Sequence, residues 1–263
     1  MISALGGFAA ALALSGAFCW VAFRLRFLDE SGAWAATALG AIILGLCGWT
    51  WVSPLLAFFI SSSLLSHARK ARTSAVDEAR GSQRDAVQVL SNGGVAGLLV
   101  LVGAIGGLDL FAAYVGSLAA ANADTWSTEI GLMFGRRPRS IATGKPVTPG
   151  TSGGVTAAGL LGAIAGAIFL VWVGNLSSGS MMTSTALGII ALAGIGGSLF
   201  DSFLGATIQA RYRCQVCGKE TEKARHCDRP TRLVRGWRWL NNDGVNLLCA
   251  AFGAVFTFFF IWK

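Results

Sequence analysis

Four acidic side chains interrupt otherwise apolar stretches of this sequence. Asp124 and Glu129 share one stretch, whereas Asp201 and Asp243 belong to two others. Ionisable groups inside membrane spans are costly and usually functional, and carboxylates together with phosphate oxygens bind Mg²⁺. We therefore predict that all four are catalytic. Asp124, Asp201 and Asp243 would hold Mg²⁺, and Glu129 would complete the site. The alternative is that these acids pair with Lys or Arg and join helices.

Helical spacing supports a shared site. Asn122, Thr125 and Glu129 follow an i, i+3, i+7 pattern and share one stripe of a helix. Gly197 and Gly205 each lie four residues from Asp201, so a neighbouring backbone can approach this carboxylate closely.

Two glycine-rich segments add a second kind of chemistry. Ile141 to Val155 leads into an apolar stretch, and Ser91 to Gly94 opens another. Glycines let backbone N–H groups face an anion, and a following helix N-terminus adds a positive dipole. Ordinary capping turns look similar. The predicted substrate- and nucleotide-binding residues are Asn92, Gly93, Gly94, Asn122, Thr143, Lys145, Gly150, Thr151, Ser152, Gly153, Gly154 and Asn242.

A third group combines cysteine with histidine. Cys214, Cys217, His226 and Cys227 fall within fourteen residues. A Cys₃His set suits a structural Zn²⁺ site, because four protein ligands leave no open position for catalysis. Free cytosolic thiols are the alternative.

Composition indicates the elements that carry these groups. The chain has 263 residues, of which 54% are hydrophobic and 13% charged, whereas soluble domains have about 25% charged residues. We predict a single all-α, polytopic membrane domain over 1–263 with eight spans, or seven if 33–66 is one broken helix. The spans are expected at 2–23, 33–50, 52–66, 91–107, 109–134, 153–174, 184–209 and 244–262.

Basic residues alternate between the connections. Segments 24–32, 67–90, 135–152 and 210–243 hold two, five, four and nine of the 21 Lys and Arg residues. Basic loops mark the cytoplasmic side. This pattern predicts cytoplasmic basic loops at 67–90 and 210–243, a cytoplasmic phosphate-binding loop at 135–152, and non-cytoplasmic termini. The net charge of +8 therefore follows topology, and nucleic-acid binding is not expected.

Several motifs resemble a known membrane family. They are Gln88 to Gly94, Ala120 to Gly131, Thr143 to Val155, Gly197 to Gly205 and Asn242-Asp243. The chain is similar here to the family of plant phytyl-phosphate kinase and vertebrate transmembrane protein nineteen, and distantly to membrane phytol and dolichol kinases that use CTP. The resemblance implies transfer of a nucleotide γ-phosphate to an isoprenyl monophosphate. The cysteine–histidine cluster is not part of it.

Together these features predict a Mg²⁺-dependent kinase that uses CTP or another nucleoside triphosphate and an isoprenyl monophosphate such as phytyl or geranylgeranyl phosphate. It is expected in a bacterial inner membrane, with its active site facing the cytoplasm. A homo-oligomer is compatible with the sequence. A lipid-phosphate transporter or flippase and a cytidylyltransferase that forms a CDP-lipid remain as alternatives.

Overall fold

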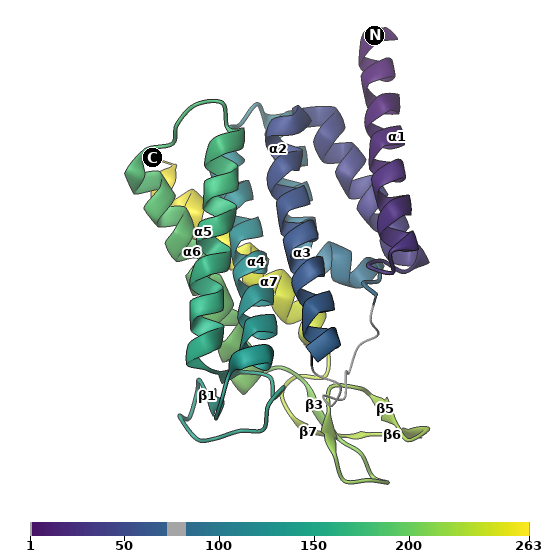
Figure 1. The fold of residues 1–263 in the computed structure, drawn as a ribbon, viewed down its shortest axis with the longest axis vertical. Coiled ribbons are helices and arrows are strands. Elements are labelled where there is room, and N and C mark those ends of the chain that lie inside the picture. Colours follow the sequence, from purple (N-terminus) through teal and green to yellow (C-terminus); the bar gives the residue numbers. More distant parts are fainter. Residues whose placement is uncertain (1, 73–82, 263) are drawn as a thin grey trace.

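The computed structural model describes residues 2–72 and 83–262. Within these ranges the chain is a bundle of long helices, with short strands gathered at one end (Figure 1). The helices are α1 (Ile2–Arg24), α2 (Glu30–Arg72), α3 (Ala86–Gly106), α4 (Phe111–Phe134), α5 (Ala157–Ser177), α6 (Ser184–Thr207) and α7 (Asn242–Ile261). The predicted all-α, polytopic class is confirmed.

Helix α2 is a hairpin of two arms, because Gly48 adopts a non-helical backbone conformation with φ 71°. The first arm runs antiparallel to α1, since Gly45 packs against the side chain of Phe8 and Gly40 packs against the side chain of Ser15. The second arm runs parallel to α1, as the contact of Phe18 with Phe59 and the later one of Phe27 with His67 show. The predicted spans 33–50 and 52–66 are thus one helical element with a sharp reversal. Positive φ favours glycine at this point.

Six helices of the described chain are long and apolar enough to cross a membrane, and α4 is not among them. Its inner half carries Asn122, Asp124 and Glu129, which lower its hydropathy. This helix is nevertheless the centre of the bundle and packs against α2, α3, α5, α6 and α7. Its outer half is almost wholly buried and rich in alanine. Protein rather than lipid surrounds it, which explains why a polar span is tolerated. The number of crossings and the side of the termini stay predictions.

Several boundaries differ from the expected ones. Helix α3 begins at Ala86, capped by Asp85, whose side chain accepts a hydrogen bond from the N–H of Gln88. The expected start near residue 91 was therefore wrong, because the cap lies one and a half turns earlier. Helix α2 extends to Arg72, so the predicted loop 67–90 begins later, and its residues 73–82 lie outside the described residues.

Two connections contain strands instead of irregular loops. β1 (Arg139–Ser140) pairs with β2 (Gly154–Val155) across the glycine-rich segment. The later connection forms a sheet of order β4-β3-β7 and a hairpin of β5 with β6. Their bounds are β3 (Arg211–Arg213), β4 (Glu220–Thr221), β5 (Arg225–His226), β6 (Arg229–Pro230) and β7 (Arg232–Arg235).

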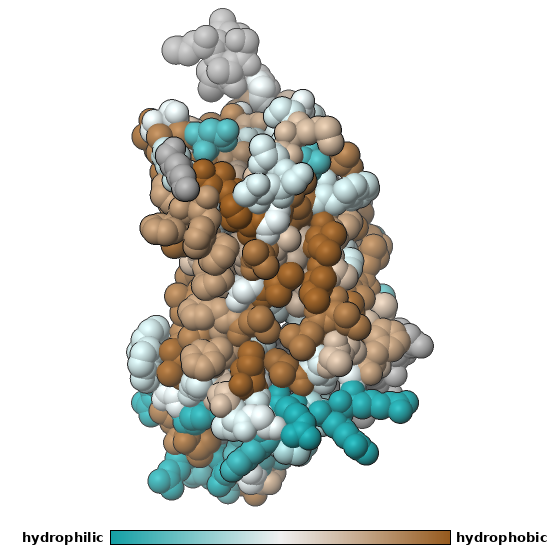
Figure 2. Space-filling model, turned by 90° about the vertical axis from the view of Figure 1, so that its left-hand side faces the viewer, coloured by the Kyte–Doolittle hydropathy of each residue, from teal (hydrophilic) through white to brown (hydrophobic). Residues whose placement is uncertain are grey.

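The surface is divided along the long axis. On the face seen in Figure 2, a broad apolar band covers the helices and hydrophilic side chains are concentrated at one end. Helix α1 begins and α7 ends toward the opposite end (Figure 1). An apolar belt of this kind is what a lipid-facing surface requires.

Candidate functional site

A cavity of about 730 Å³ opens between the strand-bearing loops and the helix ends beside them. Among the described residues, seven Lys and Arg and five Asp and Glu line it, so it presents both signs of charge. The cations are Arg26, Arg69, Lys70, Arg84, Arg211, Lys219 and Lys223, and the acids are Asp124, Glu129, Asp201, Glu220 and Glu222. Such a mixture suits a metal–phosphate ligand better than a simple anion.

Two of the predicted metal ligands share this cavity. Asp124 of α4 and Asp201 of α6 both line it, and both side chains are partly buried. The hydroxyl of Ser198, one turn before Asp201, lies 3.5 Å from a carboxylate oxygen of Asp124. Close packing brings the two helices together, since a Cβ at Gly197 would lie 2.5 Å from the Cβ of Ala120. Carboxylates from two different helices therefore line one cavity.

Glu129 lines the cavity but is already bound by α2. The guanidinium of Arg69 forms a short ion pair with it, and Ser66 Oγ donates a 2.6 Å hydrogen bond to its other oxygen. The side chains of Arg69 and Glu129 are 9% and 11% exposed. The helix-joining alternative therefore describes Glu129. The sequence predicts Arg69 in the loop 67–90, whereas the structure places it on the last turns of α2.

Arg84 is a second, partly buried cation of the cavity. Its guanidinium lies 5.7 Å from the ring centres of both Phe58 and Phe59. Burial lowers its pKa to about 10, and the charge of Glu129 partly opposes this shift. Because that pKa is far above neutrality, Arg84 keeps its positive charge under physiological conditions.

The glycine-rich segment forms one rim of the cavity. Its residues Gly150 to Gly154 all line the space. Gly153 has φ 77°, and a Cβ there would lie 2.4 Å from the backbone nitrogen of Ala206, so only glycine fits against α6. Thr156 caps α5 by accepting a hydrogen bond from the N–H of Gly159, and both residues face the cavity. A helix N-terminus thus adds its partial positive charge here.

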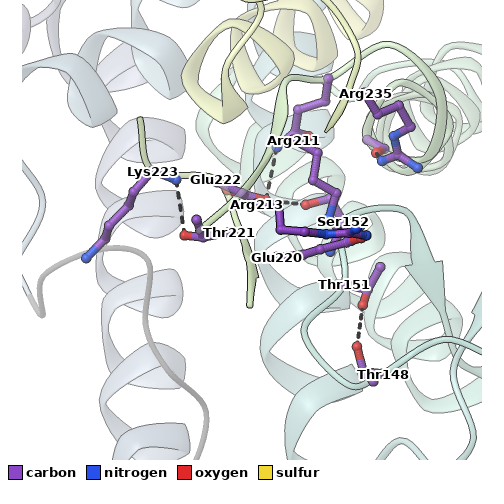
Figure 3. Close-up of polar contacts among 12 residues, drawn as sticks. Thr148, Thr151, Ser152, Arg211, Arg213, Glu220, Thr221, Glu222, Lys223 and Arg235 are labelled. Carbon is purple, nitrogen blue, oxygen red and sulfur yellow. Dashed lines mark hydrogen bonds and ion pairs between the residues drawn. The ribbon is translucent and has the colours of Figure 1, made fainter. Parts of the chain in front are cut away.

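Glu222 connects the strand-bearing loop to this rim (Figure 3). Its carboxylate accepts a short hydrogen bond from Ser152 Oγ and a 3.0 Å bond from Gln209 Nε2. Nearby, Glu220 joins β3 to β4, because Arg213 Nη2 lies 2.9 Å from one oxygen and Arg211 Nε lies 3.3 Å from the other. The loop after α6 is thereby attached to the loop before α5.

The cysteine–histidine cluster is assembled at the edge of the same loop. The ligand atoms of Cys214, Cys217, His226 and Cys227 all lie within 4.8 Å of one another. Ligands of a tetrahedral zinc with bonds of about 2.3 Å lie roughly 3.8 Å apart, so the arrangement fits such an ion. The backbone N–H of Cys217 is the largest of the hydrogen bonds that lower the pKa of the Cys214 thiol to about 6. That thiol is therefore disposed to the metal-binding thiolate form.

Comparison with models of protein families shows to which family the chain belongs. A family model described as "Integral membrane protein DUF92" matches residues 13–254. The chain belongs to the DUF92 family of integral membrane proteins. The family membership indicated by the sequence motifs is confirmed.

Three relatives of this DUF92 protein span most of its length. The chain is 36% identical to Protein PGR of Arabidopsis thaliana, with 90% of each chain covered. An uncharacterized membrane protein of Methanocaldococcus jannaschii is 32% identical over 72% of this chain and 77% of its own length. Protein VTE6, chloroplastic, of Arabidopsis thaliana is 26% identical over 87% of this chain and 63% of its own length. No solved structure matches.

Some predicted site residues of the DUF92 protein lie outside the cavity. Asn122 is fully buried: its oxygen accepts from Ser61 and Ser62 Oγ at 3.2 and 3.1 Å, and its Nδ2 donates to Gly166 O at 2.8 Å. Asn122 therefore ties three helices together. Asp243 does not line the cavity, although Asn242 beside it does, and Asn241 Nδ2 lies 3.3 Å from its carboxylate.

Of the remaining predicted residues, some line the cavity and others do not. Asn92 lines the cavity, but Gly93 and Gly94 lie inside α3, where their N–H groups belong to helical hydrogen bonds. A phosphate-binding turn is therefore not formed at that point. Thr143 and Lys145 are exposed and do not line the cavity.

Sequence reasoning missed most of the basic lining. Arg69, Arg84 and Lys223 were counted as topological markers of a cytoplasmic loop, and Glu222 was not considered. One signal was present: Arg84 directly precedes Asp85, a helix-capping residue type, at the start of an apolar run. A cation in that position must lie at the membrane boundary beside the helix start.

Proposed function

We propose that this protein is a Mg²⁺-dependent kinase that transfers the γ-phosphate of a nucleoside triphosphate to an isoprenyl monophosphate. The proposal is supported by one observation: Asp124 and Asp201 line the same cavity as a glycine-rich rim and, among the described residues, seven cationic side chains. We propose an isoprenyl monophosphate as the acceptor because the sequence motifs resemble those of the phytyl-phosphate kinase family. CTP is the nucleotide suggested by the more distant kinases.

Different parts of the cavity would bind the metal ion and the triphosphate. Asp124 and Asp201 are the residues that would hold Mg²⁺, with Asp243 at the start of α7 as a further candidate. Bound there, the ion would neutralise charge on the phosphate oxygens. The Gly150 to Gly154 rim and the start of α5 would hold the triphosphate through backbone N–H groups.

The proposed transfer needs little proton chemistry. An oxygen of the lipid monophosphate attacks the γ-phosphorus, and the bond from that phosphorus to the β–γ bridging oxygen breaks. The products are a lipid diphosphate and a nucleoside diphosphate. Because the attacking oxygen is already anionic near neutral pH, no strong general base is required, and positioning and charge neutralisation dominate. This agrees with Glu129 being occupied by Arg69 and Ser66 instead of free to act as a base.

We further propose that the Cys₃His cluster binds a structural Zn²⁺ and that the protein lies in a bacterial inner membrane with the cavity toward the cytoplasm. The close ligand atoms support the first part. The alternation of basic and uncharged connections supports the second.

The decisive experiment gives purified protein in nanodiscs Mg²⁺, geranylgeranyl monophosphate and CTP labelled at either the α- or the γ-phosphorus. The kinase proposal expects label in the lipid diphosphate from the γ-position only. Label from the α-position would instead show cytidylyl transfer with release of pyrophosphate. Lipid movement between leaflets without nucleotide consumption would favour the transporter. Either result overturns the kinase proposal.

A further inference from the structure

A second pocket lies beside the polar cavity and has a different character. Its volume is about 180 Å³, and α1, both arms of α2 and α3 enclose it. Leu14 and Phe18 of α1, Leu39 and Leu56 of α2, and Gly93 of α3 are typical of its lining. Lining residues on the first arm extend from Ala36 to Leu44, which is about 12 Å of helix. The pocket is therefore elongated along the bundle.

The two spaces meet at three polar residues. Arg84, Gln88 and Asn92 line the apolar pocket and also the polar cavity. Gln88 and Asn92 are one turn apart on α3 and linked, because Asn92 Nδ2 donates a 2.9 Å hydrogen bond to Gln88 O. We call Arg84, Gln88 and Asn92 the seam. A molecule that filled the pocket would end at the seam with its head in the charged cavity.

The guanidinium of Arg84 has no hydrogen-bond acceptor among the described residues. The main chain of Arg84 is held, because its N–H donates to Phe27 O at 3.0 Å and its O accepts from Asp29 N–H at 3.1 Å. Its guanidinium lies against Phe58 and Phe59 and makes no hydrogen bond to any described residue. A partly buried guanidinium that lies on two aromatic rings favours a negatively charged acceptor, and a phosphate is the ligand that its planar fork fits best.

The pocket also faces the bilayer. Leu14 and Trp49, which line it, are 53% and 62% exposed. They belong to α1 and to the turn of α2 at Gly48, so the wall between these elements is apolar and exposed. A hydrocarbon chain could therefore enter from the membrane without passing through water.

We propose that this pocket binds the tail of a single-chain isoprenyl monophosphate and that Arg84 binds its phosphate at the seam. This inference rests on the proposed kinase function and names the acceptor site of that reaction. The volume of about 180 Å³ leaves room for part of one hydrocarbon chain and not for two chains side by side. The head of the lipid then lies at the border of the cavity that holds Asp124 and Asp201.

The test measures binding without nucleotide, in nanodiscs, by displacement of radiolabelled geranylgeranyl monophosphate. In the wild-type protein this lipid should bind far more tightly than inorganic phosphate, geranylgeraniol or two-chain phosphatidic acid. Gly93→Leu should fill the pocket, because a Cβ there would lie 2.8 Å from Leu39 Cδ2 and 3.8 Å from Leu55 Cδ1. We expect affinity for the twenty-carbon lipid to fall at least about tenfold. Binding of dimethylallyl monophosphate should be unchanged, which also shows that the variant is folded.

Two further variants complete the test. Gly188→Leu is the matched control, because an added Cβ on this exposed position of α6 meets nothing within 4 Å, and it should bind normally. Arg84→Gln should lose the preference for the monophosphate over the alcohol.

Three results would overturn the site. They are full displacement by inorganic phosphate or phosphatidic acid at equal concentration, an unaffected Gly93→Leu variant, or unchanged head-group preference in Arg84→Gln. A parallel transfer assay separates the two proposals. Binding without transfer contradicts the kinase, and transfer with normal Gly93→Leu binding contradicts the site.

Discussion

The carboxylates and the cations of the polar cavity come from different kinds of structure. Asp124 and Asp201 lie in the second halves of long helices, and Gly197 allows α4 and α6 to pack closely. Arg84 and Lys223 instead come from a helix entrance and a strand-bearing loop. The acidic part is therefore fixed by helix packing. The cationic part depends on how the connections between helices are held in place.

From this contrast we expect the acidic and the cationic groups to bind different parts of the substrate. A metal ion requires ligands at nearly fixed distances, which helices in close contact supply. Phosphates tolerate more adjustment, and a loop can change shape as the nucleotide enters and leaves. The effects of substitutions in the two groups should therefore differ in magnitude and in the kinetic constant that changes.

The largest effect is expected for Asp124→Asn. Removing one charge from the pair should lower phosphoryl transfer by about 100-fold or more, with normal insertion and purification. Asp109→Asn is the matched control, because Asp109 precedes α4 at its other end and its carboxylate accepts from the N–H of Phe111 at 3.1 Å. Steady-state kinetics with labelled nucleotide would measure both. Near-normal turnover in Asp124→Asn would remove Asp124 from the mechanism.

A large effect on stability is expected for Arg69→Met. Glu129 would remain buried and charged without its partner, which costs about 3–5 kcal/mol. Thermal unfolding in detergent would measure the loss. The double variant Arg69→Met with Glu129→Leu should recover most of it, since both charges are then removed. Equal stability of the single and double variants would show that the pair has no structural role.

The residues in these two predictions differ in how far the sequence alone could identify them. Asp124 and Asp201 were identifiable because acids are rare within apolar runs. The pairing of Arg69 with Glu129 was not, because it depends on α2 continuing past its apolar part and running parallel to α4. The eight apolar runs located the helices well, except that Gly48 reverses the chain without a separate loop.

Loops were harder to predict for a similar reason. The cysteine–histidine spacing indicated a cluster, and its ligand atoms do converge. The attachment of Glu222 to Ser152 joins residues seventy positions apart, and no local pattern encodes such a contact. Asn122 shows the opposite error, because a polar residue beside Asp124 looked like part of the site but serves packing.

A smaller effect is expected from loss of the zinc. Cys217→Ser should abolish stoichiometric zinc, measured by inductively coupled plasma mass spectrometry, and weaken nucleotide binding several-fold while the helices stay folded. Cys47→Ser, in the helical bundle, should keep the metal. Wild-type protein purified without any zinc, yet fully active, would contradict the proposed site.

The smallest effect is expected for Glu222→Gln. The amide keeps its size but weakens the charge-assisted bond to Ser152, so KM for nucleotide should rise about twofold to fivefold with kcat nearly unchanged. Glu30→Gln, an exposed position at the start of α2, is the control. A large fall in kcat instead would place Glu222 among the groups that act on the transferring phosphate.

The position of the polar cavity, confined to the inner helix ends and their loops, has a consequence for membrane traffic. Under the proposed kinase function, a lipid head group is modified in the leaflet where it arrived, and spent nucleotide returns to the compartment that supplied it. The reaction requires no passage of charge across the bilayer. Its rate should therefore be independent of membrane potential.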